Sequence, residues 1–146
     1  MQGMNIFFDC DYTILDWNGG LRPGVRELFR RLTGDGHAVY VWSGVGIRWD
    51  EVKRHNLDPY VVACFHKPLF NYESRLEGLG ITPRPDMVVD DYLDIVRALG
   101  GIRVRPYIHE QLADREMEKV YQILSSLSMD GHNVDDSQAP PAPESP

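Results

Sequence analysis

The chain has 146 residues, of which 42% are hydrophobic and 25% are charged. This length and composition suit one compact core, so we expect a single folded domain and exclude collagen-like and low-complexity classes. The two cysteines, Cys10 and Cys64, lack metal-binding spacing, which argues against a disulfide scaffold or a structural zinc site. No apolar run approaches the ~20 residues that cross a bilayer, and no signal peptide is evident, so we expect a soluble, cytoplasmic protein with no membrane partner.

The negative charge is concentrated at the C-terminal end. The formal net charge is −7, but four of the 22 acidic residues and none of the 15 basic ones lie beyond Met129, which leaves −3 for residues 1–129. We therefore expect no broad nucleic-acid footprint. Residues 130–146 contain four prolines and hardly any large apolar side chain, so burial cannot offset the entropy lost on ordering them. We predict one folded domain over residues 1–129 and a flexible tail over 130–146.

Short apolar runs alternate with segments whose apolar residues have helical spacing. Runs rich in β-branched and aromatic residues are typical of strands, whereas Pro at a start and Gly at an end mark a helix. In chain order, the sequence predicts a strand at 5–8, a helix from 23 to 34, a strand at 37–42, a helix at 48–56, strands at 61–65 and 86–89, a helix at 92–99, a strand at 102–104 and a helix at 110–127. This alternation predicts an α/β fold, a three-layer α/β/α sandwich around a mostly parallel sheet.

Chemically active side chains follow four of the predicted strands, and ligands of open parallel sheets bind at these carboxyl ends. Several carboxylates in one place repel each other unless a hard cation joins them, which favours Mg²⁺. An ammonium and a hydroxyl group suit the oxygens of a phosphoryl group. One carboxylate can act as a nucleophile and a second can carry a proton. The residues concerned are Asp9, Asp11, Ser43, Lys67, Asp90, Asp91 and Asp94.

Four segments, taken in chain order, resemble the four ordered motifs of the haloacid dehalogenase (HAD) superfamily. They span residues 5–95, about two thirds of the chain, and each stands at or just past a predicted strand end. DxDxT alone is a weak signal, whereas four ordered motifs are specific. The segments are Asp9-Cys10-Asp11-Tyr12-Thr13, Ser43, Lys67 within His66-Lys67-Pro68, and Val88-Val89-Asp90-Asp91-Tyr92-Leu93-Asp94. The resemblance implies a HAD-like Rossmannoid fold, with residues 1–129 as the catalytic domain.

Carried over position by position, the resemblance implies a Mg²⁺-dependent phosphomonoesterase. Asp9 would be the nucleophile that forms an aspartyl-phosphate. Asp11 would be the general acid for the leaving group and then the base that activates water. Ser43 and Lys67 would bind the phosphate, and Lys67 would also steady Asp9. Gly44, which precedes a predicted helix, would offer a backbone N–H group to the same phosphate.

The metal ligands implied by the resemblance are Asp9, Asp11 and Asp90. A supporting acid follows Asp90, and two residues compete for this place. Asp94 matches the GDxxxD form of the fourth motif, whereas Asp91 would make it an Asp-Asp form. The sequence leaves this choice open.

The spacing of the motifs leaves no room for a substantial cap domain. Only one loop and one helix fit between Thr13 and Ser43, and again between Ser43 and Lys67. The chain therefore resembles capless members of the superfamily, which often act on phosphorylated macromolecules or borrow a lid from a neighbouring subunit. We expect a phosphorylated substrate, which includes macromolecules as candidates. Without a cap, the loop at 12–20 or a partner would have to exclude water from the site.

Two alternatives stay open at this stage. One is a nucleic-acid end or nucleotide phosphatase of the same fold, with local phosphate contacts from arginines at 22, 26, 30 and 31 or at 103 and 105. The other is a non-catalytic phosphate-binding or assembly module. Trp17, Trp42 and Trp49 are candidates for an apolar wall, although core packing is the simpler expectation for Trp42 and Trp49.

Overall fold

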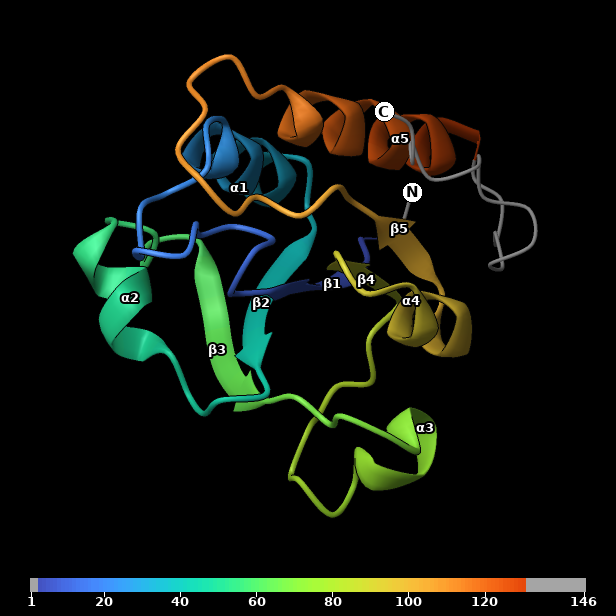
Figure 1. Cartoon of the computed structure of the whole chain (residues 1–146). Helices are drawn as coiled ribbons and strands as arrows, with labels where there is room; N and C mark the ends of the chain where they lie inside the picture. Colours follow the sequence, from blue (N-terminus) through green and yellow to red (C-terminus); the bar gives the residue numbers. More distant parts are fainter. Residues whose placement is uncertain (1–2, 131–146) are drawn as a thin grey trace.

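The computed structural model describes residues 3–130 (Figure 1). In this part of the chain, five parallel strands form one sheet in the order β3-β2-β1-β4-β5. The strands are β1 (Asn5–Asp9), β2 (Ala38–Ser43), β3 (Val61–His66), β4 (Met87–Asp90) and β5 (Gly101–Arg103). The predicted parallel sheet is confirmed, and each strand begins and ends within one or two residues of its expected bounds.

Helices cover both faces of this sheet, which confirms the three-layer sandwich without a large cap. One face carries α1 (Val25–Gly34), α2 (Trp49–Arg54) and α5 (Glu116–Asp130), and α1 packs directly against α5 (Figure 1). The other face carries α4 (Leu93–Leu99) and the short α3 (Tyr72–Arg75), which contact each other. Within the described residues, the connections between β1 and β3 hold only α1 and α2.

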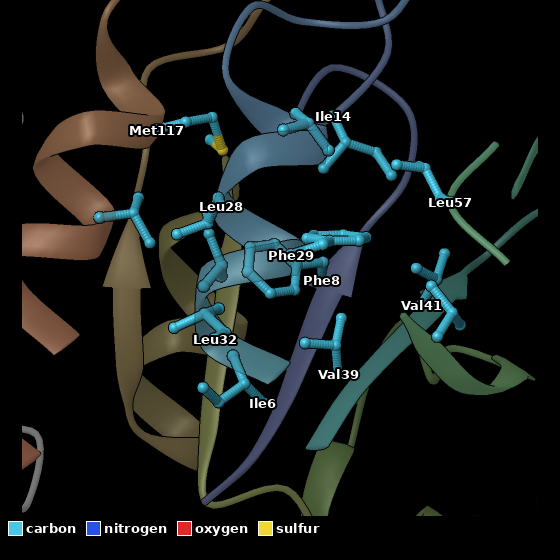
Figure 2. Packing of buried hydrophobic residues seen from close by; sticks show 14 of the residues in the cluster. Ile6, Phe8, Ile14, Leu28, Phe29, Leu32, Val39, Val41, Leu57 and Met117 are labelled. Atoms are coloured by element: carbon cyan, nitrogen blue, oxygen red, sulfur yellow. The ribbon is translucent and has the colours of Figure 1, made fainter. Parts of the chain in front are cut away.

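The side chains of β1 alternate between two hydrophobic cores. Ile6 and Phe8 point to the side of α1 and α5, where the rings of Phe8 and Phe29 lie 4.7 Å apart (Figure 2). Phe7 points to the opposite side and stacks on Tyr40 at 4.6 Å. A strand buried on both faces has to be apolar at every position, which is why this segment is an unbroken apolar run.

The last helix differs from its prediction, because α5 begins at Glu116 instead of residue 110. Residues 104–115 instead run as an irregular segment over the loop that follows β1. The Tyr107 N–H donates to the Tyr12 carbonyl at 2.8 Å, and the Gln111 N–H donates to the Tyr107 hydroxyl at 3.0 Å. Asp114 then accepts a hydrogen bond from the Glu116 N–H at 3.3 Å, at the first turn of the helix. The apolar periodicity misplaced this boundary because the contact between Tyr107 and Tyr12 joins residues that are far apart in the chain.

A buried ion pair fastens this segment to the rest of the domain. Arg22 is 1% exposed, and its Nε and Nη2 atoms donate to the two Asp114 oxygens at 2.7 and 3.0 Å. We expect Asp114→Ala to lower the free energy of unfolding by about 3 kcal/mol, because it leaves a buried guanidinium without its carboxylate. Urea unfolding measures this loss. Asp58→Ala, at an exposed position, is the control, and a loss equally small in both variants would contradict the prediction.

Three further expectations concern cysteines, membranes and the tail. Cys10 and Cys64 are both buried and free, in agreement with the absence of a predicted disulfide. Between residues 3 and 130, no helix has the length and apolar character needed to span a membrane. The predicted tail at 130–146 lies outside the described residues, apart from Asp130, at which α5 ends.

Candidate functional site

The candidate residues meet at the carboxyl edge of the sheet. Asp9 ends β1, Ser43 ends β2, Asp90 ends β4, and Lys67 directly follows β3. The chain builds outward from β1 in one direction up to β3 and then continues on the other side with β4, so the strand order reverses beside β1. Crevices form at such reversals. A pocket of about 500 Å³ opens here.

Lys67 joins the two most buried carboxylates of the pocket. Its Nζ atom lies 3.0 Å from Asp9 Oδ1 and 3.0 Å from Asp90 Oδ2. Asp9 is 6% exposed and Asp90 is fully buried. The Lys67 N–H also donates to the Ser43 carbonyl at 2.9 Å, which fixes the start of this side chain beside β2. The predicted contact between Lys67 and Asp9 is therefore present.

The ionisation of these groups is strongly perturbed. Burial raises the pKa of Asp9 well above its usual 3.8, and repulsion from Asp90 raises it further, although Lys67 opposes both effects. Burial also raises the pKa of Asp90, to about 6, against the lowering influence of Lys67. Burial by itself lowers the pKa of Lys67, but attraction to Asp9 and Asp90 outweighs burial and raises this pKa. The carboxylates are thus held together at an electrostatic cost that a bound cation relieves.

Asp91 completes the acidic floor of the pocket, and the buried Thr13 hydroxyl lies between it and Asp9. The buried Thr13 hydroxyl lies 3.2 Å from Asp9 Oδ2 and 3.2 Å from Asp91 Oδ1, and it accepts a hydrogen bond from the Asp91 N–H at 3.1 Å. Asp94, in contrast, is exposed in the first turn of α4 and does not line the pocket. Of the two supporting acids left open by the sequence, the structure therefore brings Asp91 to the site.

Three carboxylates could hold a metal ion here. Asp9, Asp90 and Asp91 each offer an oxygen, and these oxygens lie within 4.8 Å of one another. Among residues 3–130, the ammonium of Lys67 is the only one that touches Asp9 and Asp90, so the cluster keeps an excess of negative charge. Hard oxygen ligands and negative charge suit Mg²⁺ or Ca²⁺ better than a softer metal. Asp11 contributes no atom to this cluster, and its carboxylate instead pairs with a cation.

That cation is Arg48, a residue that sequence reasoning missed. Its Nη1 atom donates to Asp11 Oδ2 at 2.7 Å and to Ser43 Oγ at 3.3 Å, so it links the ends of β1 and β2. Ser43 Oγ also accepts the Val45 N–H at 3.1 Å in the turn that contains Gly44. Arg48 stands 37 residues from Asp11, and no local pattern marks it. Only its position at the start of α2 brings it to the pocket.

Tyrosines, and none of the three tryptophans, line this pocket of the described chain. Tyr12, Tyr72 and Tyr92 contribute to its wall. Trp42 is fully buried in the core under α4, as expected, and Trp49 packs against the other core. The Trp17 side chain is exposed, and the Trp17 backbone N–H donates to the Ile108 carbonyl at 2.8 Å. Tyrosines line the pocket because they lie in the segments that follow the strand ends.

The arginines considered for nucleic-acid contacts are mostly engaged elsewhere. Arg22 is buried against Asp114, and Arg30 and Arg31 both pair with Glu27 on α1. Arg26 donates to the His55 carbonyl, and Arg105 lies 3.7 Å from Glu116. Arg103 alone of this set approaches the site, with its Nε atom 3.4 Å from the Asp91 carbonyl. These side chains do not form one basic surface around the pocket.

The pocket thus gathers almost the whole predicted set from distant parts of the chain. Its lining includes Asp9, Asp11, Ser43, Gly44, Lys67, Asp90 and Asp91, and it omits Asp94. No model of a known protein family matches this chain, and no curated protein matches its sequence. The case for a function therefore rests on the chemistry of these side chains.

Proposed function

We propose that this chain is a Mg²⁺-dependent phosphomonoesterase that works through an aspartyl-phosphate on Asp9. The observation that carries the proposal is the position of Lys67 Nζ, 3.0 Å from both Asp9 and Asp90, at the floor of a pocket with a third carboxylate. A buried nucleophile beside an ammonium and an acidic metal cluster is suited to phosphoryl transfer, which depends on positioning and charge neutralisation. The order of the four HAD-like motifs supports the same reaction.

In the first step, a carboxylate oxygen of Asp9 forms a bond to phosphorus while the bond from phosphorus to the alcohol oxygen breaks. Asp11 gives a proton to that oxygen, so a neutral alcohol leaves. Lys67 and the Ser43 hydroxyl bind oxygens of the transferred group. Arg48, in contact with both Asp11 and Ser43, orients these two groups relative to each other.

In the second step, water attacks the phosphorus of the aspartyl-phosphate. Asp11 takes a proton from this water, the bond from phosphorus to Asp9 breaks, and inorganic phosphate leaves. Asp11 is then protonated again and Asp9 is restored as a carboxylate, so the cycle balances. A Mg²⁺ ion held by Asp9, Asp90 and Asp91 would neutralise negative charge on the phosphoryl oxygens.

The proposed metal site includes Asp91 and excludes Asp94, and the two residues can be tested separately. In the wild-type protein, we expect Mg²⁺ at about a hundredfold above its Kd to raise the free energy of unfolding by about 2.7 kcal/mol. Asp94→Asn should keep this gain, because the side chain lies outside the cluster, whereas Asp91→Asn should lose most of it. Thermal unfolding with and without Mg²⁺ measures the difference. Equal gains in the two variants would contradict the role given to Asp91.

A nucleic-acid end phosphatase is less well supported than a phosphatase of monoesters whose alcohol is uncharged. Arg22, Arg30 and Arg31 are paired with acidic residues, and of the arginines considered for nucleic-acid contacts only Arg103 lies near the pocket. With a formal charge of −3 over residues 1–129, general attraction of a polyanion is weak.

Hydrolysis of a generic aryl phosphate tests the proposed function directly. The wild-type protein should release phosphate in the presence of Mg²⁺ and stop when the metal is chelated. A phosphoryl adduct on Asp9, trapped by acid quench and located by peptide mass spectrometry, would support the covalent step. Metal-independent turnover, or an adduct on another residue, would refute the mechanism. No turnover together with retained binding of phosphate and Mg²⁺ would instead favour the non-catalytic module.

A further inference from the structure

The mouth of the pocket is apolar and aromatic, in contrast to its acidic floor. Tyr12, Val45, Leu69 and Tyr92 line the pocket, with exposed fractions of 41%, 77%, 60% and 58%. Large apolar side chains that gather on a surface commonly mark a binding site. Within two residues of these positions, the same segments expose further apolar side chains, those of Ile47, Phe70 and Leu93. A molecule that extends out of the floor therefore meets apolar surface.

Two of these side chains are held in place by the backbone. Tyr12 has a φ of 68°, a left-handed conformation that bulky residues rarely adopt, and hydrogen bonds of 2.8 Å to Leu15 and Tyr107 fix its N–H and carbonyl groups. Leu69 lies over Gly44, where an added Cβ would stand 2.5 Å from the Leu69 side chain. The backbone at Tyr12 and the contact between Leu69 and Gly44 thus help to define the apolar mouth.

The charges at the pocket disfavour an anionic leaving group. Among the described residues that line it, Lys67 is the one cationic side chain, and its Nζ atom is already bound between Asp9 and Asp90. Arg48 does not line the pocket, and its guanidinium is already engaged with Asp11, Ser43 and Glu51. The lining of the pocket therefore offers a nucleotide or other polyanion no unpaired cation for the charges beyond its reacting phosphate, and Arg103, which approaches the site, is not part of that lining.

We propose that this mouth selects phosphate monoesters whose alcohol is aromatic or otherwise bulky and apolar, an inference that rests on the proposed function. The phosphoryl group reaches the floor, where Lys67 and the carboxylates lie. The alcohol part stays between the tyrosines and Leu69, where burial of its apolar surface contributes binding free energy. Selection of the substrate thus comes from the rim of the pocket instead of a separate cap domain.

Three esters separate this proposal from its alternatives. 2-Phenylethyl phosphate and ethyl phosphate have alcohols of similar acidity, so their difference reports on the apolar part and not on leaving-group reactivity. We expect kcat/KM for the phenylethyl ester to exceed that for the ethyl ester by at least about tenfold. Adenosine 5′-monophosphate, which carries an aromatic base on a polar sugar, should be the poorest of the three. Equal values, or a preference for the nucleotide, would overturn the inference.

Variants at the rim of the pocket test whether these side chains cause the preference for the phenylethyl ester. Tyr92→Ser and Leu69→Ser should each reduce the ratio of the phenylethyl to the ethyl kcat/KM several-fold. Leu112→Ser, at a 78% exposed leucine outside the pocket lining, is the matched control and should leave the ratio unchanged. An unchanged ratio in both rim variants would overturn the inference, even if the wild-type preference were present.

A measurement of ester binding tests this inference independently of the proposed chemistry. The affinities of the two simple esters are measured by calorimetry with the Asp9→Asn protein and Mg²⁺, where no turnover is expected. Tighter binding of the phenylethyl ester without any wild-type turnover would support the apolar mouth and refute the phosphatase. Turnover of both esters at equal rates and with equal affinities would support the phosphatase and overturn the inference about its substrates.

Discussion

Replacing Asp9 with asparagine is expected to lower turnover of any phosphate ester by at least about a thousandfold, because the amide oxygen is too weak a nucleophile to attack phosphorus. No neighbouring group takes over easily. Asp90 Oδ2 is occupied by Lys67, and Asp90 Oδ1 accepts the Tyr92 N–H at 2.9 Å. Asp11 is directed at Arg48. The residual rate should therefore depend only on the groups that bind the metal and the phosphate.

The same substitution should leave the fold intact. Asparagine has nearly the same volume as aspartate, and it removes a buried charge that repels Asp90. We expect the melting temperature of Asp9→Asn to equal or slightly exceed that of the wild type. Asp94→Asn, a carboxylate change at the same end of the sheet but outside the cluster, is the activity control and should retain turnover. Substantial turnover in Asp9→Asn would refute the assigned nucleophile, and unfolding of this variant would leave the trapped adduct as the decisive measurement.

Lys67→Met is expected to affect both activity and stability. Within the described part of the chain, this side chain supplies the one ammonium that touches Asp9 and Asp90, and it is only 11% exposed. Loss of one such group that neutralises charge on a transferred phosphoryl group should reduce kcat on the order of a hundredfold or more. Its removal also leaves two buried carboxylates without a partner cation. We expect the free energy of unfolding without metal to fall by about 3 kcal/mol.

Added Mg²⁺ distinguishes the two effects. A divalent cation replaces the lost positive charge, so Mg²⁺ should raise the melting temperature of Lys67→Met more than that of the wild type, while activity stays low. Lys53→Met, which removes an exposed lysine of α2, should change neither property appreciably and serves as the control. A stable Lys67→Met protein without metal would show that the carboxylates do not depend on this ammonium.

Much of the fold follows from local patterns. β1 is an apolar run because both of its faces are buried, and the bounds of α1 are marked by Pro23 before it and Gly36 after it. The exceptions are instructive. α5 begins six residues later than its periodicity predicts, because Tyr107 and Asp114 bind to residues near the start of the chain. The short α3 lies in a connection for which no helix is predicted, since four residues are too few to leave a periodic signal.

The candidate site divides in the same way. Its main side chains are predictable because they directly follow strands, and the carboxyl ends of parallel strands meet at one edge. Arg48 is not predictable in this way, since its contacts with Asp11 and Ser43 depend on how the start of α2 is placed over the sheet. The choice between Asp91 and Asp94 depends on the direction in which the chain leaves β4 to begin α4.

By itself, the sequence determined the alternation of strands and helices, the acidic residues at the strand ends and the lack of room for a cap. These features depend on residues close together in the chain, because periodicity, turn residues and motif spacing are local properties of the sequence. Only the tertiary structure decided that Asp91 joins Asp9 and Asp90, that Arg48 holds Asp11, and that tyrosines form the mouth of the pocket. Such contacts join residues far apart in the chain, and they exist only once the sheet and its helices have packed together.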